Sequence, residues 1–85
     1  MRKKRFNKPV VVQLGRVDRD RVVGTPAEAA ELLLHQWRLL ESPERLKAME
    51  ACLQVIKGEK PPRVAREAFV KAAVAARVFV DEKRL

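Results

Sequence analysis

Thr25-Pro26-Ala27-Glu28 and Ser42-Pro43-Glu44 decide the architecture of this chain, because each stretch marks the start of a helix. A Thr or Ser oxygen at the N-cap accepts a hydrogen bond from a backbone N–H that has no partner inside the helix. Proline at the first helical position gives up no hydrogen bond, and glutamate favours the positive end of the helix dipole. The two stretches predict helices over about 26–40 and 43–57, with Gly58 just past the end of the second.

The spacing of apolar residues predicts which face of each helix is buried. In the first helix the predicted core residues are Ala29, Ala30, Leu33, Leu34, Trp37 and Leu40. In the second they are Leu46, Met49, Cys52, Leu53 and Ile56. Pro61-Pro62 introduces a third helix over about 63–76, with core residues Val64, Ala65, Ala68, Phe69, Ala72, Ala73 and Ala76. The third face is mostly methyl groups, which would let a neighbouring element approach closely.

Three short segments read as strands. Residues 9–14 and 21–23 are rich in valine and are separated by a polar stretch, Asp18-Arg19-Asp20, which predicts a β-hairpin with a loose loop. Residues 77–81 predict a last strand that could join the hairpin. The expected order is β-β-α-α-α-β, and the expected fold class is α+β, with three helices packed on one face of a small antiparallel sheet.

A set of packing and punctuation positions carries a resemblance to a known family. The set comprises Phe6, Lys8-Pro9-Val10, Gly15, Trp37, Cys52, Gly58, Ala65-Arg66, Ala68-Phe69 and Ala72-Ala73. In this order the chain resembles a family of small bacterial proteins catalogued only as a domain of unknown function. It departs from the family pattern at Arg38, where proline is usual, and at Ala76-Arg77, where a glycine commonly precedes the last strand. The resemblance covers nearly the whole chain and implies no function.

Composition limits the class of protein. A chain of 85 residues makes one domain, and a hydrophobic content of 47% excludes wholesale disorder. The single cysteine, Cys52, cannot form an intramolecular disulfide and fits a reducing compartment. No apolar run approaches the length of a membrane span. We therefore expect a soluble, cytoplasmic protein.

The positive charge is concentrated near the N-terminus. Of the formal net charge of +8, five positive residues precede Pro9 with no acid among them. This predicts a basic, flexible tail over 1–8 and a single domain over 9–85. The candidate phosphate contacts are Arg2, Lys3, Lys4 and Arg5 in the tail, with Arg63, Arg66 and Lys71 on the third helix. The tail can be a solvated terminus or a non-specific nucleic-acid contact.

Catalytic chemistry is not indicated. His35, the only imidazole, follows Glu31 by four residues on a polar face, where a solvated pair is more common than an acid–base pair. Cys52 lies in mid-helix, away from any N-terminus that would lower its pKa, so we expect a structural thiol. One His and one Cys cannot supply a zinc site, and the glycines form no phosphate loop. We expect a protein that is not an enzyme and takes no cofactor or metal.

The chain has more apolar helical positions than one core face needs. Leu32 and Leu39 lie off the predicted core face of the first helix, and Val70 and Val74 lie among charged residues of the third. Ala48, Ala51 and Val55 form a weaker second stripe on the second helix. Leu32, Leu39, Val70 and Val74 either form a surface for a protein partner or a second copy, or are covered within the monomer. We expect a protein-interaction or self-associating module; the alternative is a nucleic-acid-associated accessory protein.

Overall fold

The two helix starts are formed by the predicted caps. In the computed structural model, which describes residues 5, 6, 8–13, 21–37 and 42–80, the Thr25 hydroxyl accepts a hydrogen bond from the Glu28 N–H at 3.1 Å. The Ser42 hydroxyl accepts one from the Arg45 N–H, also at 3.1 Å. The Glu28 carboxylate turns back and accepts from the Gly24 N–H at 3.3 Å. Both capping predictions are confirmed.

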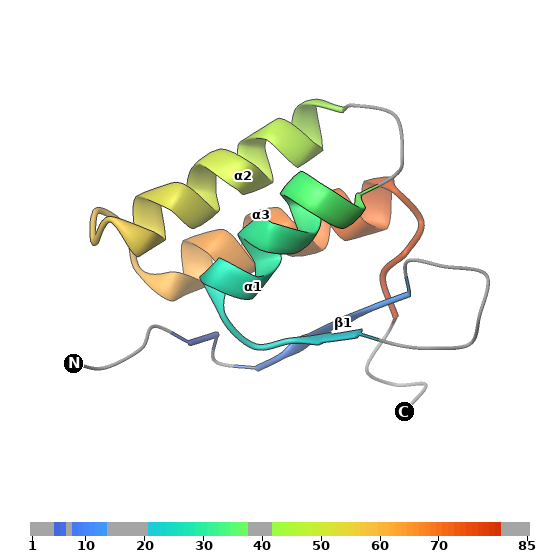
Figure 1. Ribbon diagram of the computed structural model, residues 1–85, viewed down its shortest axis with the longest axis horizontal. Helices are drawn as coiled ribbons and strands as arrows, with labels where there is room; N and C mark the ends of the chain where they lie inside the picture. Colours follow the sequence, from blue (N-terminus) through green and yellow to red (C-terminus); the bar gives the residue numbers. More distant parts are fainter. Residues whose placement is uncertain (1–4, 7, 14–20, 38–41, 81–85) are drawn as a thin grey trace.

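The described residues form five regular elements and one π-helical turn (Figure 1). Strands β1 and β2 span Val10–Val12 and Arg21–Val23, and helix α1 spans Pro26–Glu31. A π-helix, η1, continues α1 over Leu32–Gln36. Helices α2 and α3 span Pro43–Ile56 and Pro62–Ala75. The α+β class and the order β-β-α-α-α of the first five predicted elements agree with the prediction.

The first helix is shorter than predicted. It was expected over 26–40, but Trp37 leaves the helical conformation with φ −83° and ψ 88°. The wider π-helical turn also ends the 3.6-residue periodicity on which the predicted face rests. Leu32, which was placed off the core face, is buried, whereas Leu34, which was placed on it, is exposed. The predicted positions Leu39 and Leu40 lie outside the described residues.

Both α2 and α3 are followed by a residue with positive φ. Gly58 has φ 85° after α2, as predicted, and Arg77 has φ 61° after α3. At each end the N–H groups of the positive-φ residue and of the residue after it donate to carbonyls of the last helical turn. After α2, Gly58 donates to Val55 and Glu59 to Gln54. After α3, Arg77 donates to Val74 and Val78 to Ala73. This is the Schellman arrangement, for which glycine is the usual residue. Arg77 therefore adopts the conformation that glycine usually takes at this position of a helix end.

The sheet is smaller than the predicted three strands. β1 and β2 pair antiparallel, with Val10 opposite Val23, Val11 opposite Val22 and Val12 opposite Arg21. The predicted last strand is reduced to an isolated bridge between Val12 and Phe79. It still lies against the free edge of β1, because the Gln13 N–H donates to the Val78 carbonyl and the Val80 N–H to the Val11 carbonyl.

All three helices lie on one side of the strands (Figure 1), and the core fills the space between the two layers. Phe69 of α3 is fully buried at its centre, and the Trp37 ring lies 5.7 Å from it, centroid to centroid. Val10, Val12 and Val23 cover the core from the sheet. Apart from these two residues and Phe6, the core is mainly aliphatic and alanine-rich, as the low aromatic content predicts.

The predicted buried face of α2 is wrong. The helix buries Ala48, Ala51, Cys52 and Val55, and it exposes Leu46, Leu53 and Ile56. Of the predicted face only Cys52 is buried and Met49 is partly buried. The physical reason lies in α3, whose buried residues include Ala65, Ala72 and Ala73. A helix that presents methyl groups allows close approach, and the small side chains of α2 meet it better than its leucines.

The packed part of the chain reaches further toward the N-terminus than the predicted boundary at residue 9. Phe6 is buried in the core cluster, and its N–H donates to the Gly24 carbonyl at 2.9 Å. The Lys8 carbonyl accepts a hydrogen bond from the Arg66 Nε of α3 at 2.9 Å. Two residues of the predicted 1–8 tail are therefore part of the folded domain.

Candidate protein-interaction surface on α2

Helix α2 carries a row of large aliphatic side chains that the monomer does not cover. Leu46, Leu53 and Ile56 are 56%, 49% and 47% exposed, and Met49 between them is partly buried. At about 100° per residue these four positions fall within roughly 80° of the helix circumference. We call Leu46, Met49, Leu53 and Ile56 the α2 stripe. Its spacing of 3, 4 and 3 residues is that of the a and d positions of a coiled coil.

The two flanks of the α2 stripe differ. On one flank Glu50 and Lys57 are exposed to solvent. On the other, the Arg45 guanidinium donates from Nε and Nη2 to the Leu33 carbonyl, at 3.0 and 2.7 Å. These charge-assisted bonds fasten the start of α2 to η1. The stripe is therefore presented on an anchored helix with one open, charged flank.

The predicted interaction residues are not brought together. Leu32 is only 3% exposed and belongs to the core cluster, so its assignment to a partner surface is wrong. Val70 is partly buried and packs against the core, whereas Val74 is exposed. Leu39 lies outside the described residues. The surplus of apolar residues is confirmed, but α2 carries most of it.

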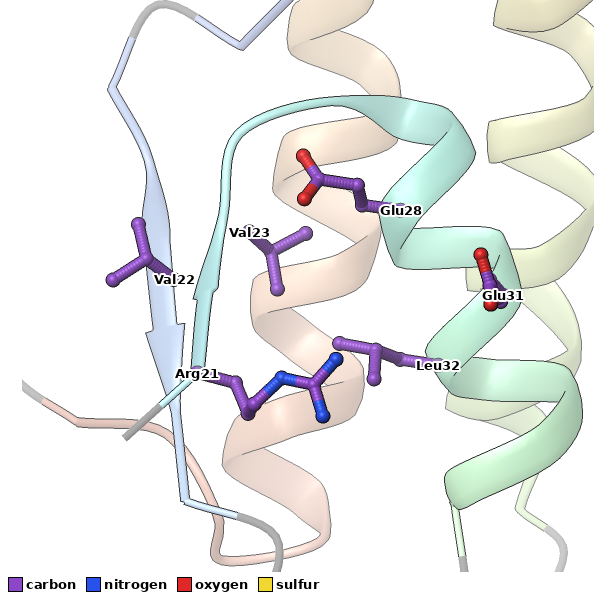
Figure 2. Close-up of a pocket in the computed structure, with 6 residues that line it drawn as sticks. All are labelled: Arg21, Val22, Val23, Glu28, Glu31 and Leu32. Atoms are coloured by element: carbon purple, nitrogen blue, oxygen red, sulfur yellow. The ribbon is translucent and has the colours of Figure 1, made fainter. Parts of the chain in front are cut away.

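Two further large apolar residues are exposed without neighbours of the same kind on their own elements. Leu34 lies on η1, and Val22 lies on β2, where its side chain points away from α1 (Figure 2). Single exposed apolar side chains are normal on protein surfaces. The α2 stripe differs because several such side chains follow one helix face.

One predicted phosphate contact on α3, Arg66, is held against the backbone of the N-terminal segment. The Arg66–Lys8 hydrogen bond joins the N-terminal segment to the first turns of α3. Arg5, Arg63 and Lys71 are exposed, while Arg66 is partly buried. The remaining predicted phosphate contacts, Arg2, Lys3 and Lys4, lie outside the described residues.

A small hollow lies between β2 and α1 (Figure 2). Its volume is about 110 Å³, and it is lined by Arg21, Val22, Val23, Glu28, Glu31 and Leu32. Figure 2 shows the Arg21 side chain extending from β2 toward α1, and the Glu28 carboxylate belongs to the helix cap already described. Pockets for small molecules are usually several hundred cubic ångströms, so this hollow suits water better than a substrate.

Cys52 and His35, the two residues weighed for catalysis, have opposite surroundings. Cys52 is fully buried, and burial raises the pKa of its thiol from 9.0 to about 11. The thiol therefore stays protonated at neutral pH, as expected of a structural cysteine. His35 is exposed on η1. Within the described part of the chain, no group of three or more His, Cys, Asp or Glu residues could hold a metal ion.

A protein-family model matches residues 8–80, and its description is protein of unknown function, DUF982. The chain belongs to this family. The match covers every element described above, from the Lys8 carbonyl that Arg66 contacts to the bridge at Phe79. No curated protein and no solved structure matches the chain.

The DUF982 match confirms the family resemblance seen in the sequence. Because the family description assigns no activity, it adds no site residue to those that the geometry provides. Among the residues that the structure places, no helix has the length and apolar character to cross a membrane. The α2 stripe remains the feature of this DUF982 protein that most requires a functional explanation.

Proposed function

We propose that this DUF982 protein is a non-enzymatic protein-interaction module and that the α2 stripe is its contact face. One observation supports the proposal above the others: Leu46, Leu53 and Ile56 are each about half exposed on one face of an anchored 14-residue helix. A monomer gains nothing in stability from these exposed surfaces. A partner that covers them gains the free energy of removing them from water.

The size of that gain suits a reversible contact. Full burial of a leucine or isoleucine contributes about 1.5–3 kcal/mol, so covering the exposed half of each side chain contributes about 1 kcal/mol. The three residues together contribute about 3 kcal/mol from this chain, before the partner's own surface is counted. Association costs several kcal/mol in lost freedom of motion, so the contact should be tight only if the partner is equally apolar.

Other features support a binding role rather than a catalytic one, and a location in the cytoplasm. A buried, protonated Cys52 and an exposed His35 do not form a nucleophile–base pair. A single cysteine with no disulfide partner in the chain fits the reducing cytoplasm, where we propose that the protein acts.

The test compares two leucine variants. Leu53→Glu places a charge within the α2 stripe, and Leu34→Glu places the same charge at an exposed leucine outside it. Tagged wild-type, L53E and L34E proteins are used to capture partners from a nuclease-treated native lysate. Untagged copies of the chain count as partners. We expect the wild type and L34E to retain the same protein at both low and high salt and L53E to lose it. Equal capture by all three proteins would contradict the proposal.

A second candidate function is non-specific binding to nucleic acid through the basic N-terminal segment. It is favoured by the Arg66–Lys8 hydrogen bond, which joins the segment around Lys8 to α3, where Arg63 is exposed. Clustered cations gain affinity by releasing counterions from the phosphate backbone.

Deleting residues 1–5 should weaken duplex DNA binding and leave the fold intact. The deletion must stop before Phe6, which is buried in the core. Removing one cation that neutralises a phosphate should reduce the slope of log K against log salt by about 0.9. Fluorescence anisotropy over a salt series measures the slope, and thermal unfolding checks the fold. If the truncated chain keeps the full slope, residues 1–5 carry none of the affinity and α3 binds the phosphates. Leu34→Ala, at an exposed residue outside the basic segments, serves as the control and should bind DNA like the wild type.

A further inference from the structure

We propose that the α2 stripe is covered by the α2 stripe of a second copy of this chain, with the two helices antiparallel. This inference rests on the proposed function and names its partner. It is carried by two observations on α2: the order of the apolar side chains, and the charges on the open flank of the helix.

The a and d positions of the α2 stripe can pair with those of an identical helix that runs in the opposite direction. Leu46 and Leu53 occupy a positions, and Met49 and Ile56 occupy d positions. In an antiparallel pair each a residue meets a d residue of the other helix. Leu46 therefore meets Ile56 of the second copy, and Met49 meets Leu53. Each pairing occurs twice about a two-fold axis near residue 51, so every side chain of the stripe has a partner in a closed, isologous contact.

The charges on the open flank match in the same arrangement. Glu50 and Lys57 are both exposed beside the stripe, in equivalent positions one heptad apart. About an axis near residue 51, the row along the flank reads Lys, Glu, Glu, Lys. Each Glu50 has the other Glu50 on one side and Lys57 of the other copy on the other side, about 7.5 Å away along the axis. Two Glu–Lys contacts therefore offset one Glu–Glu contact. Charges at such flanking positions set the choice and orientation of helical partners. The other flank is already occupied, because Arg45 bonds to Leu33 and Cys52 is buried.

Spin-label distances test the arrangement directly. Glu50→Cys and Lys57→Cys place a nitroxide at two positions on the same flank of full-length protein. At 1.5 Å per residue, the two copies of position 50 are offset by about 3 Å along the helix axis and those of position 57 by about 18 Å. We therefore expect a clearly shorter label separation for E50C than for K57C by pulsed dipolar spectroscopy. The native Cys52 is buried, so wild-type protein is the control and should take up no label.

Three outcomes of this experiment are distinguishable. A shorter distance at 50 than at 57, abolished when L53E is added and retained when L34E is added, supports the antiparallel dimer. Equal distances at the two positions overturn it in favour of a parallel pair. The absence of dipolar coupling at high protein concentration overturns it in favour of a monomer. In that last case the proposed function still stands if the capture experiment retains a protein other than this chain on the wild type and L34E and loses it on L53E.

A charge exchange gives an independent check by analytical ultracentrifugation. Glu50→Lys or Lys57→Glu alone gives the flank a single sign of charge, and each should raise the dimer dissociation constant severalfold at low salt. Combining E50K with K57E restores both signs of charge to the flank, in the order Glu, Lys, Lys, Glu, and should bring the dissociation constant back toward the wild-type value. A double variant that dimerises no better than the single variants would overturn the proposed pairing.

Discussion

Replacing Trp37 by alanine should lower the free energy of unfolding by about 3–5 kcal/mol. The Trp37 side chain is only 8% exposed and belongs to the core cluster, where its ring packs at 51° to that of Phe69. Truncation removes both the transfer free energy of the indole and its packing against the Phe69 ring. Because a domain of this size is stable by only about 5–15 kcal/mol, the variant should be largely unfolded or close to it at 37 °C.

Urea unfolding followed by far-ultraviolet circular dichroism measures this loss. Leu34→Ala is the matched control, since Leu34 is exposed and its truncation should change the stability by no more than about 0.5 kcal/mol. Trp37→Phe should lose less than the alanine variant, because it keeps an aromatic ring near Phe69. A loss below about 1 kcal/mol for Trp37→Ala would mean that the ring does not contribute to the core.

The starts of α1 and α2 and the end of α2 were predictable because their signals are local. Thr25 and Ser42 cap α1 and α2, and Gly58 takes the positive φ that follows α2. Each signal depends on residues within one turn, so no tertiary information is needed. Arg77 shows the limit of such signals. It adopts positive φ without being glycine, because the backbone bonds of Arg77 and Val78 and the bridge at Phe79 hold the chain in that turn.

The buried faces were less predictable because they depend on fit between helices. Leu46, Leu53 and Ile56 are the larger apolar residues of α2, and a ranking by hydrophobicity alone selects them for the core. Ala48, Ala51 and Val55 are buried instead, opposite an α3 face that is itself rich in alanine. The signal was present in the sequence: two helices with alanine stripes can pack closely only if those stripes face each other.

The candidate site was missed for the same reason. The sequence contained more apolar residues than one core could cover, and this led to an interaction surface as the predicted function. Once the leucines of α2 were assigned to the core, the surplus was placed on Leu32 and Leu39 of the first helix and on Val70 and Val74 of the third. The structure buries Leu32 and exposes the leucines and the isoleucine of the α2 stripe. The same reasoning about surplus apolar residues therefore applies to α2.

Phe6 is the clearest case that local pattern could not resolve. It lies among basic residues and was predicted to belong to a tail, yet it is buried. One aromatic residue in a charged segment gives no periodicity from which to infer burial. Only the hydrogen bond from its N–H to Gly24 and its place in the core cluster show that the domain begins before residue 9.

Aspartate at Val55 should unfold the domain, whereas aspartate at Leu53 should leave it folded. Val55 is fully buried on the inner face of α2, and Leu53 is about half exposed on the α2 stripe. A carboxylate at position 55 must lose its hydration or stay protonated, and none of the buried residues that the structure describes carries a charge to pair with it. The expected cost is several kcal/mol, comparable with the whole stability of the domain. The variants share one helix and one substitution, so the lower helix propensity of aspartate affects both alike.

The measurement is urea or thermal unfolding at concentrations below those at which the chain associates, so that loss of a dimer does not count as loss of the fold. Under these conditions we expect Leu53→Asp to lie within about 1 kcal/mol of the wild type. If Leu53→Asp unfolds the chain as readily as Val55→Asp, then Leu53 is a core residue and the α2 stripe is not a free surface. The contrast between two residues two positions apart therefore decides whether α2 has a face left over for a partner, on which the proposed function and the antiparallel dimer both depend.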